Sequence, residues 1–252
     1  MLPITDPFFY LCAIPAVFIV GMAKGGFGGG LALVGVPLMS LAIPPVQAAG
    51  ILLPILLVMD AVGLISYRAI FCRKTLAILI PAGLMGTLIG YFAAAYISET
   101  HIRLVTGAIA LIFVLDYWFN NKANKPPKPQ NVLLGGFWGT VSGVTSFIAH
   151  AGGAPFQMYV LPLRLAPPVM AGTAVIFFSV VNFSKVLPYF ALGQFDAKNI
   201  ATSLVLLPLA PLATLAGIKI VKHINKELFY KITYAALFVI ALKLIWDGAS
   251  GF

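Results

Sequence analysis

The stretch GMAKGGFGGG, Gly21 to Gly30, decides how this chain folds. Six of its ten residues are glycine, and each glycine costs about 1 kcal/mol relative to alanine inside a helix. The run therefore predicts a break in an otherwise apolar segment. A second interruption, IAHAGGAP from Ile148 to Pro155, lies about half a chain later. Paired breaks of this kind in the two halves of a membrane protein are typical of transporter binding sites.

The composition is that of a membrane protein. Hydrophobic residues make up 61% and charged residues 9% of the 252 residues, whereas a soluble domain has about 25% charged residues. Apolar runs of roughly 20 residues, long enough to cross a bilayer core of about 30 Å, recur along the chain. We therefore predict an all-α polytopic membrane protein with no separate soluble domain.

The net charge of +9 does not indicate a nucleic-acid partner. Most of the basic residues flank apolar segments, as the positive-inside rule expects. Cys12 and Cys72 are too few and too scattered for a disulfide framework or a metal cluster.

Breakers and apolar lengths divide each half of the chain into the same five segments. Residues 1–120 form the first predicted repeat and residues 132–252 the second. The polar, proline-rich residues 121–131 between them read as a cytoplasmic linker. The expected segments are Phe8 to Ala23, Leu31 to Ile43, Val46 to Tyr67, Leu76 to Ile97, Ile102 to Phe119, Val132 to Ala149, Pro155 to Leu165, Val169 to Leu192, Ile200 to Val221 and Leu228 to Trp246.

The two halves align residue by residue, which indicates an internal duplication. Phe27 falls on His150, and the pair Pro44, Pro45 falls on Pro167, Pro168 in the same register. With a four-residue slip, the second set of matches pairs Pro81 with Pro208, Thr87 with Thr214 and Gly90 with Gly217.

The first two segments of each repeat are predicted to form a broken hairpin of short helices. As one helix, residues 8–43 would be about 54 Å long, and the separate pieces are each shorter than a comfortable span. With hairpins, one side of the membrane receives nearly all the flanking basic residues and the other only Arg103 and Lys198, as the positive-inside rule favours. Both termini then lie outside, and the odd number of segments makes the second repeat inverted. Re-entrant and fully spanning hairpins fit this pattern equally well.

The glycines of the two breaks suggest an anion site. Helices that begin after them present unpaired N–H groups and a positive dipole end, and glycine lets an oxyanion approach closely. The alternative is that these glycines only pack helices together. The candidate glycines are Gly25, Gly26, Gly28, Gly29, Gly30, Gly152 and Gly153.

Four polar side chains complete the candidate substrate site. Lys185 lies well inside an apolar segment, and intramembrane ionisable residues are functional candidates by default. Asp60, in the corresponding segment of the first repeat, is its natural partner, either in a structural ion pair or in coupling. Asn182 is a neutral donor. Lys24 is either a flanking charge or a ligand, and His150 is a structural residue, an anion donor or a proton carrier.

No catalytic motif is present, so we expect no enzyme, no cofactor and no bound metal. The expected partners are a small anion and the lipid bilayer, and a homo-oligomer is possible. A channel or a non-transporting assembly module remains the rival class.

Two long stretches carry a family resemblance. Phe27 to Gly63 and His150 to Phe190 resemble the two repeat signatures of the TauE/SafE family of sulfite exporters, also called the toluene sulfonate uptake permease family. The resemblance implies a bacterial-type plasma membrane carrier for sulfite, sulfonates or related sulfur-containing anions. We expect secondary export of sulfite or an organosulfonate, with an anion channel or an uptake permease for another small organic anion as the alternative.

Overall fold

The computed structural model describes residues 2–26, 35–93, 96, 99–119, 126–193 and 195–250. These residues form helices and no strand, which confirms the all-α prediction. The helices are α1 (Pro7–Gly26), α2 (Gly35–Met39), α3 (Pro45–Tyr67), α4 (Arg73–Ala93), α5 (Glu99–Phe119), α6 (Val132–Ala149), α7 (Gly153–Val160), α8 (Pro167–Ser184), α9 (Val186–Ala191), α10 (Ala197–Leu206), α11 (Leu209–His223) and α12 (Lys226–Ser250).

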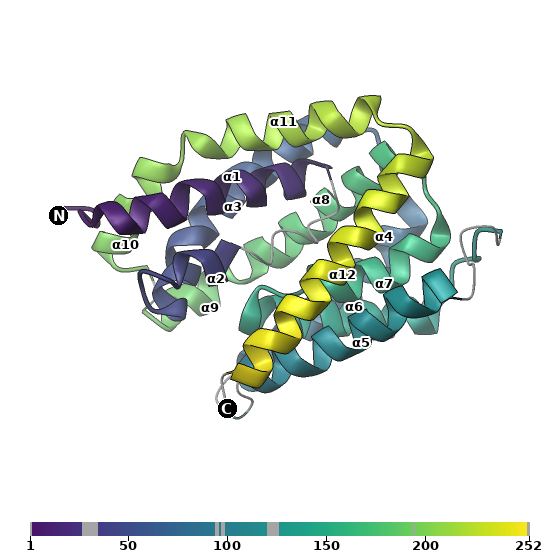
Figure 1. The fold of residues 1–252 in the computed structure, drawn as a ribbon, viewed down its shortest axis with the longest axis horizontal. Coiled ribbons are helices and arrows are strands. Elements are labelled where there is room, and N and C mark those ends of the chain that lie inside the picture. Colours follow the sequence, from purple (N-terminus) through teal and green to yellow (C-terminus); the bar gives the residue numbers. More distant parts are fainter. Residues whose placement is uncertain are drawn as a thin grey trace.

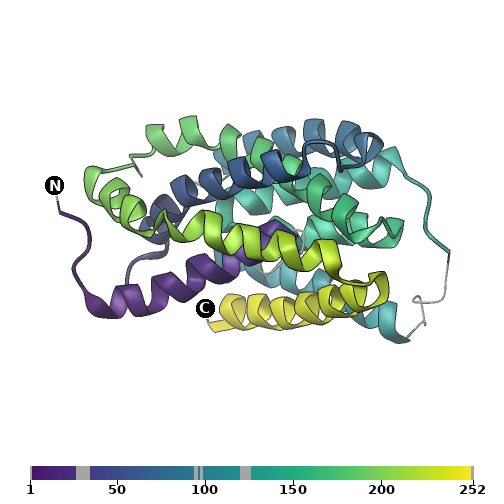
Figure 2. The same ribbon diagram turned by 90° about the horizontal axis from the view of Figure 1, so that it is seen from above.

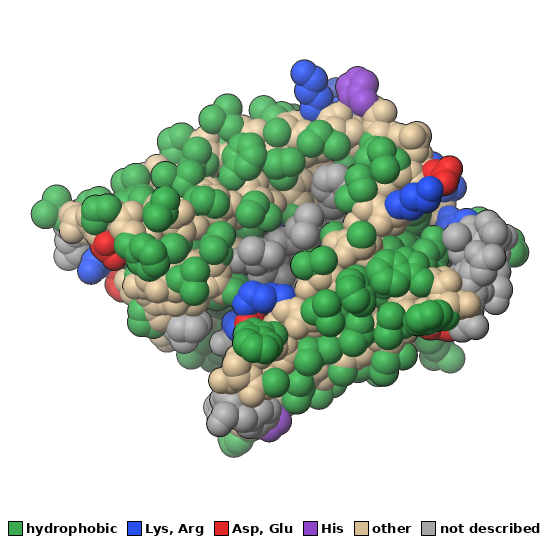
Figure 3. Space-filling view, viewed as in Figure 1, with side chains coloured by type: hydrophobic (Ala, Val, Ile, Leu, Met, Phe, Trp, Pro, Cys, Tyr) green, Lys and Arg blue, Asp and Glu red, His purple; other side chains and the backbone are tan. Residues whose placement is uncertain are grey.

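Several of these helices have the length and the surface of membrane spans. Five described helices are long and apolar enough to cross a bilayer, and the bent pair α10 and α11 makes a sixth candidate. Apolar side chains cover most of the face seen in Figure 3, and charged side chains gather at a few places on it. A water-exposed surface of this kind would aggregate, so the described helices belong in lipid.

The packing of the helices follows the same plan in both halves. Helix α1 packs along α11, and at the corresponding place α4 packs along α6. The pairs α5 with α12 and α3 with α8 each join corresponding helices of the two halves. Figure 1 and Figure 2 show α1 beside α11 and the long α12 running along α5. Helices at aligned positions of the two halves therefore make matching contacts.

Glycines let these helix pairs approach at backbone distance. A Cβ atom added at Gly25 would lie 2.1 Å from the carbonyl oxygen of Thr214 on α11, and one at Gly217 would lie 2.2 Å from that of Met22 on α1. At the matching α4–α6 contact, a Cβ atom at Gly86 would lie 2.1 Å from the carbonyl oxygen of Thr140. No larger residue fits at these crossings without movement of the backbone.

The ends of the second hairpin agree with the sequence. Helix α6 ends at Ala149, as predicted, and its cap His150 has a left-handed backbone with φ 50°. Helix α7 begins at Gly153, only three residues beyond the cap. The corresponding turn of the first hairpin, residues 27–34, lies outside the described residues.

Three segment predictions need correction. Helix α1 continues through Gly26 instead of ending near Ala23, because its glycines are held against α11. The segment predicted from Val169 to Leu192 is interrupted at Lys185, between α8 and α9. The segment from Ile200 to Val221 bends by 47° where Pro208 follows α10, although the aligned Pro81 lies inside the continuous α4.

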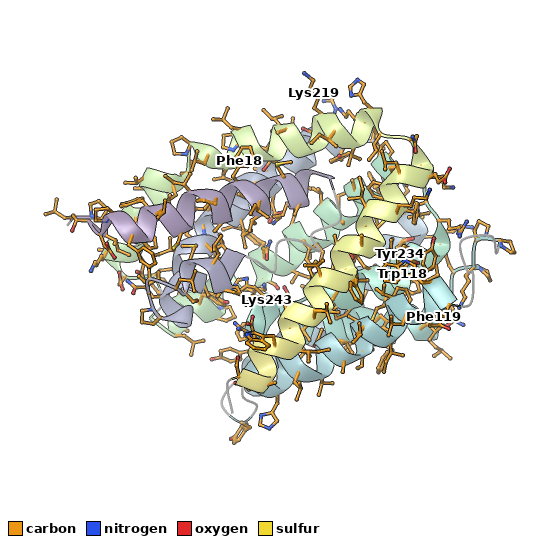
Figure 4. All side chains as sticks on the ribbon, in the orientation of Figure 1. Phe18, Trp118, Phe119, Lys219, Tyr234 and Lys243 are labelled. Atoms are coloured by element: carbon orange, nitrogen blue, oxygen red, sulfur yellow. The ribbon has the colours of Figure 1, made fainter. Side chains whose placement is uncertain are left out.

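The two ends of the molecule carry different parts of the chain. Both ribbon views place the N-terminus and α10 at one end, and the α11–α12 connection toward the other (Figures 1 and 2). Figure 4 shows Lys219 near the far end of α11 and Trp118 with Phe119 at the end of α5. The neighbouring Tyr117 stacks on Tyr234 of α12 with ring centroids 3.5 Å apart. The interior that concerns the site lies between these two ends, where α1, α3 and α8 meet.

Candidate functional site

A small cavity lies where α1, α3 and α8 meet the break between α6 and α7. Its volume is about 40 Å³, which is room for about three water molecules. The residues that line it are Lys24, Leu52, Leu56, Ser146, His150, Gly152, Gly153, Phe178 and Asn182.

Lys24 brings a positive charge to the wall of this cavity. It sits near the C-terminal end of α1, is 6% exposed, and its Nζ lies 2.6 Å from Oδ1 of Asp60 on α3. The same Nζ lies 3.5 Å from the carbonyl oxygen of Leu56. An ion pair of this kind offsets the cost of placing a lysine charge in the interior of a membrane protein. Lys24, predicted as a flanking charge or a ligand, is buried and paired in the described structure, and its role as a ligand stays a prediction.

Asp60 is the centre of a chain of polar contacts across the two halves. The Asn182 side-chain amide donates to Oδ2 of Asp60 at 2.8 Å, and the Oδ1 atom of Asn182 lies 3.4 Å from Nζ of Lys185. Lys185 donates to both the carbonyl oxygen and the hydroxyl of Ser146, each at 2.7 Å. The chain therefore runs from α1 through α3 and α8 to α6, and both Ser146 and Asn182 also face the cavity.

The expected Asp60–Lys185 ion pair is therefore corrected. The direct partner of Asp60 is Lys24, and Lys185 reaches Asp60 only through Asn182. The physical reason is the position of α1, which lies against α3 and brings Lys24 to the carboxylate. Lys185 is fully buried and is not itself a lining residue, but it contacts two residues that are, Ser146 and Asn182.

The break between α6 and α7 supplies the second side of the cavity. The hydroxyl of Ser142 donates to the carbonyl oxygen of Gly152 at 2.7 Å and fixes the turn. The Nε2 atom of His150 lies 2.8 Å from the hydroxyl of Tyr189, so its ring is held at the wall. Gly152 and Gly153 stand at the start of α7, where a helix presents backbone N–H groups without partners in the helix and a positive dipole end.

The predicted glycines divide into three groups. Gly152 and Gly153 line the cavity. Gly25 and Gly26 are not among its lining residues and are packed against Thr214, Gly217 and Val221 of α11, and their part in substrate binding stays a prediction. Gly28, Gly29 and Gly30 lie outside the described residues.

Ser142 and Ser146 are site residues that sequence reasoning missed. They precede His150 at intervals of four residues, so the three side chains lie along one face of α6 and its cap. This polar stripe in an apolar helix is the signal that could have identified them. A larger cavity of about 350 Å³ is lined mainly by apolar residues such as Val105, Trp138 and Met158, together with His101 and three threonines.

The site combines a buried cation, neutral hydrogen-bond donors and a helix start in an apolar surrounding, which is the chemistry of a small-anion site in a membrane. The family model described as Sulfite exporter TauE/SafE matches residues 13–244 of this chain. The chain belongs to the TauE/SafE family. TauE/SafE proteins are membrane transporters, so this chain is a multi-pass membrane transporter and not a member of an enzyme family. Comparisons with curated proteins and with solved structures gave no match.

Proposed function

We propose that this TauE/SafE protein is a secondary transporter of a small sulfur-containing oxyanion, sulfite or an organosulfonate, and that it works as an exporter from the cytoplasm. The family supports the sulfur chemistry and the direction. The sequence contains no nucleotide-binding loop, and the transport is therefore secondary or passive.

The observation that carries this proposal is Lys24 on the wall of the central cavity. Lys24 lines the cavity together with Asn182, Ser146 and Gly153 at the start of α7, so an oxyanion in the cavity would meet one cation and several neutral donors. Such a mixed set satisfies oxyanion oxygens without water, and the helix start adds backbone donors. Lys24, His150, Gly152, Gly153 and Asn182 are the proposed substrate-binding residues.

Three further residue groups have proposed roles. Lys185 and Asp60 position the lining residues through Ser146 and Asn182. Gly28, Gly29 and Gly30 are proposed to complete the site from the first hairpin, as the aligned second hairpin does with Gly152 and Gly153.

We also propose that residues 1–120 and 132–252 are inverted repeats joined by the cytoplasmic linker 121–131, with both termini outside a bacterial-type plasma membrane. The exchange of packing partners between the halves supports this relation, because α1–α11 and α4–α6 are equivalent contacts. Inverted repeats place a substrate site between them near the middle of the membrane, which agrees with the position of the cavity between α3 and α8.

Flux in proteoliposomes tests the function directly. Purified protein should move labelled sulfite and a taurine-like sulfonate, with a rate that saturates as the concentration rises. Single-channel currents, or a flux that never saturates, would favour an anion channel instead. The proposal fails if no sulfur oxyanion moves and none raises the melting temperature of the purified protein.

A further inference from the structure

The ionisable groups around the cavity do not balance in charge. Lys24 and Asp60 form one ion pair at 2.6 Å and neutralise each other. Lys185 adds a second buried ammonium, with 0% exposure, whose hydrogen-bond partners in the described structure are the neutral oxygens of Ser146 and Asn182. With Lys24 and Lys185 protonated, Asp60 ionised and His150 neutral, the formal charge of the cluster is +1.

The remaining neighbours do not supply the missing negative charge. The segment 27–34, FGGGLALV, contains no ionisable side chain. Arg103 and Lys243, at the far end of α5 and α12, both contact Asp247, and Lys243 is half exposed. Among the described residues, Asp60 is the acidic group that reaches the cluster, and its carboxylate is already shared by Lys24 and Asn182.

We infer that the site selects oxyanions by charge and takes a singly charged anion in preference to a doubly charged one. This inference rests on the proposed function. A buried, unbalanced charge costs several kcal/mol, so one negative charge in the cavity completes the balance. A dianion of the same shape would leave a buried net charge of −1 and lose that advantage. Hydrogen sulfite and sulfonates are then better ligands than sulfite dianion or sulfate.

The cluster offers an isosteric series that changes the charge and little else. Asn182→Asp lowers the net charge to zero, and Asp60→Asn raises it to +2, while both keep the shape of the side chain. The double variant Asn182→Asp with Asp60→Asn returns the net charge to +1 with the carboxylate moved from α3 to α8. Lys185→Gln reaches zero by a different route, since it removes a cation instead of adding an anion.

The test uses two tetrahedral probes with fixed and different charges, methanesulfonate and sulfate, at one pH. Binding to the full-length purified protein is measured by calorimetry and by competition with labelled sulfite in proteoliposomes. We expect the wild type and the double variant to bind methanesulfonate at least about tenfold more tightly than sulfate, which is about 1.4 kcal/mol. Asp60→Asn should reverse or erase that ratio, and both Asn182→Asp and Lys185→Gln should weaken both probes by about tenfold or more.

The outcomes separate this inference from the function on which it rests. If the wild type transports sulfite but the ratio of the two probes is the same in all five proteins, charge selection is wrong and the transporter remains. If the wild type transports no sulfur oxyanion and binds neither probe, the proposed function is wrong as well. Elution volume and melting temperature in detergent establish that each variant is folded, and the double variant supplies a second route to +1 if a single variant is lost.

Discussion

Asn182 of α8 donates its side-chain amide to Asp60 of α3 at 2.8 Å, and this contact joins the two halves of the protein at the cavity. Asp60 also holds Lys24 of α1, while Asn182 lies next to Lys185. A change at any of these residues is therefore expected to act on the others. Single variants alone cannot separate binding from positioning, and several of the following predictions use matched pairs.

Lys24→Met is expected to abolish transport and to destabilise the protein. The variant removes a cation from the cavity wall and leaves Asp60 buried without its ion partner, which costs about 3–5 kcal/mol. The double variant Lys24→Met with Asp60→Asn removes the stranded charge as well, so it should regain most of the stability and none of the transport. Melting temperature and proteoliposome flux measure the two effects. Normal flux in either variant would remove Lys24 from the substrate site.

Gly153→Leu is expected to abolish transport while leaving the protein inserted and folded. Gly153 lines the cavity at the start of α7, and a leucine side chain there would occupy the space of the ligand. Gly136→Leu on α6 is the matched control, because a Cβ atom at Gly136 meets nothing within 4 Å. Flux and membrane fractionation are compared for the two variants. Equal flux in both would show that the start of α7 is not part of the site. The variant Gly29→Leu, outside the described residues, is predicted to behave as Gly153→Leu does.

Gly25→Ala is expected to lower stability rather than ligand affinity. The added Cβ atom would lie 2.1 Å from the carbonyl oxygen of Thr214, so α1 and α11 must separate, and overpacking of this kind costs about 1–3 kcal/mol. The melting temperature should fall, whereas Gly136→Ala should leave it nearly unchanged. Loss of sulfite binding without any loss of stability would restore Gly25 to the substrate site.

Cysteine accessibility tests the proposed orientation. In a background with Cys12→Ala and Cys72→Ser, cysteines at positions 128 and 222 should react with a membrane-impermeant maleimide only from the cytoplasm, and a cysteine at 198 only from outside. The reason is the excess of basic residues on the linker side of the membrane. Labelling of positions 128 and 198 from the same side would contradict the inverted arrangement. Re-entrant and fully spanning hairpins predict the same labelling pattern.

Much of the fold could be predicted from apolar length and breakers. The end of α6 at Ala149 follows from an apolar run that meets a histidine and two glycines, and α12 and α5 follow from long uninterrupted runs. The bend before α11 could not be predicted in the same way. Pro81 and Pro208 occupy aligned positions in the two halves. Helix α4 continues through Pro81, whereas α10 ends just before Pro208. Neighbouring helices decide whether a proline in a membrane helix bends it, because they can take over the hydrogen bonds that it frees.

The candidate site could be predicted only in part from the sequence, for a similar reason. Lys185 and Asp60 stood out as buried charges in apolar segments, and both belong to the polar chain beside the cavity. The residues that contact Lys185 and Asp60 could not be predicted from the sequence. The alignment of the two halves indicates how deep a residue lies in the membrane, but it does not show which helices are neighbours. Composition likewise does not distinguish a glycine that lines a cavity, such as Gly153, from one that admits a neighbouring backbone, such as Gly25.

The close crossing of α1 and α11 has a consequence for how the protein is made. Met22 and Gly25 of the first helix meet Thr214 and Gly217, which leave the ribosome only when nearly the whole chain has been synthesised. At about 5–20 residues per second, the first helix waits in the bilayer for on the order of ten seconds or more with its glycine face uncovered. Lys24 and Asp60 are closer together in the sequence, and their ion pair joins α1 to α3, two helices that are both made long before α11. The α1–α3 contact at the cavity therefore needs only the early part of the chain, whereas the α1–α11 crossing needs nearly all of it.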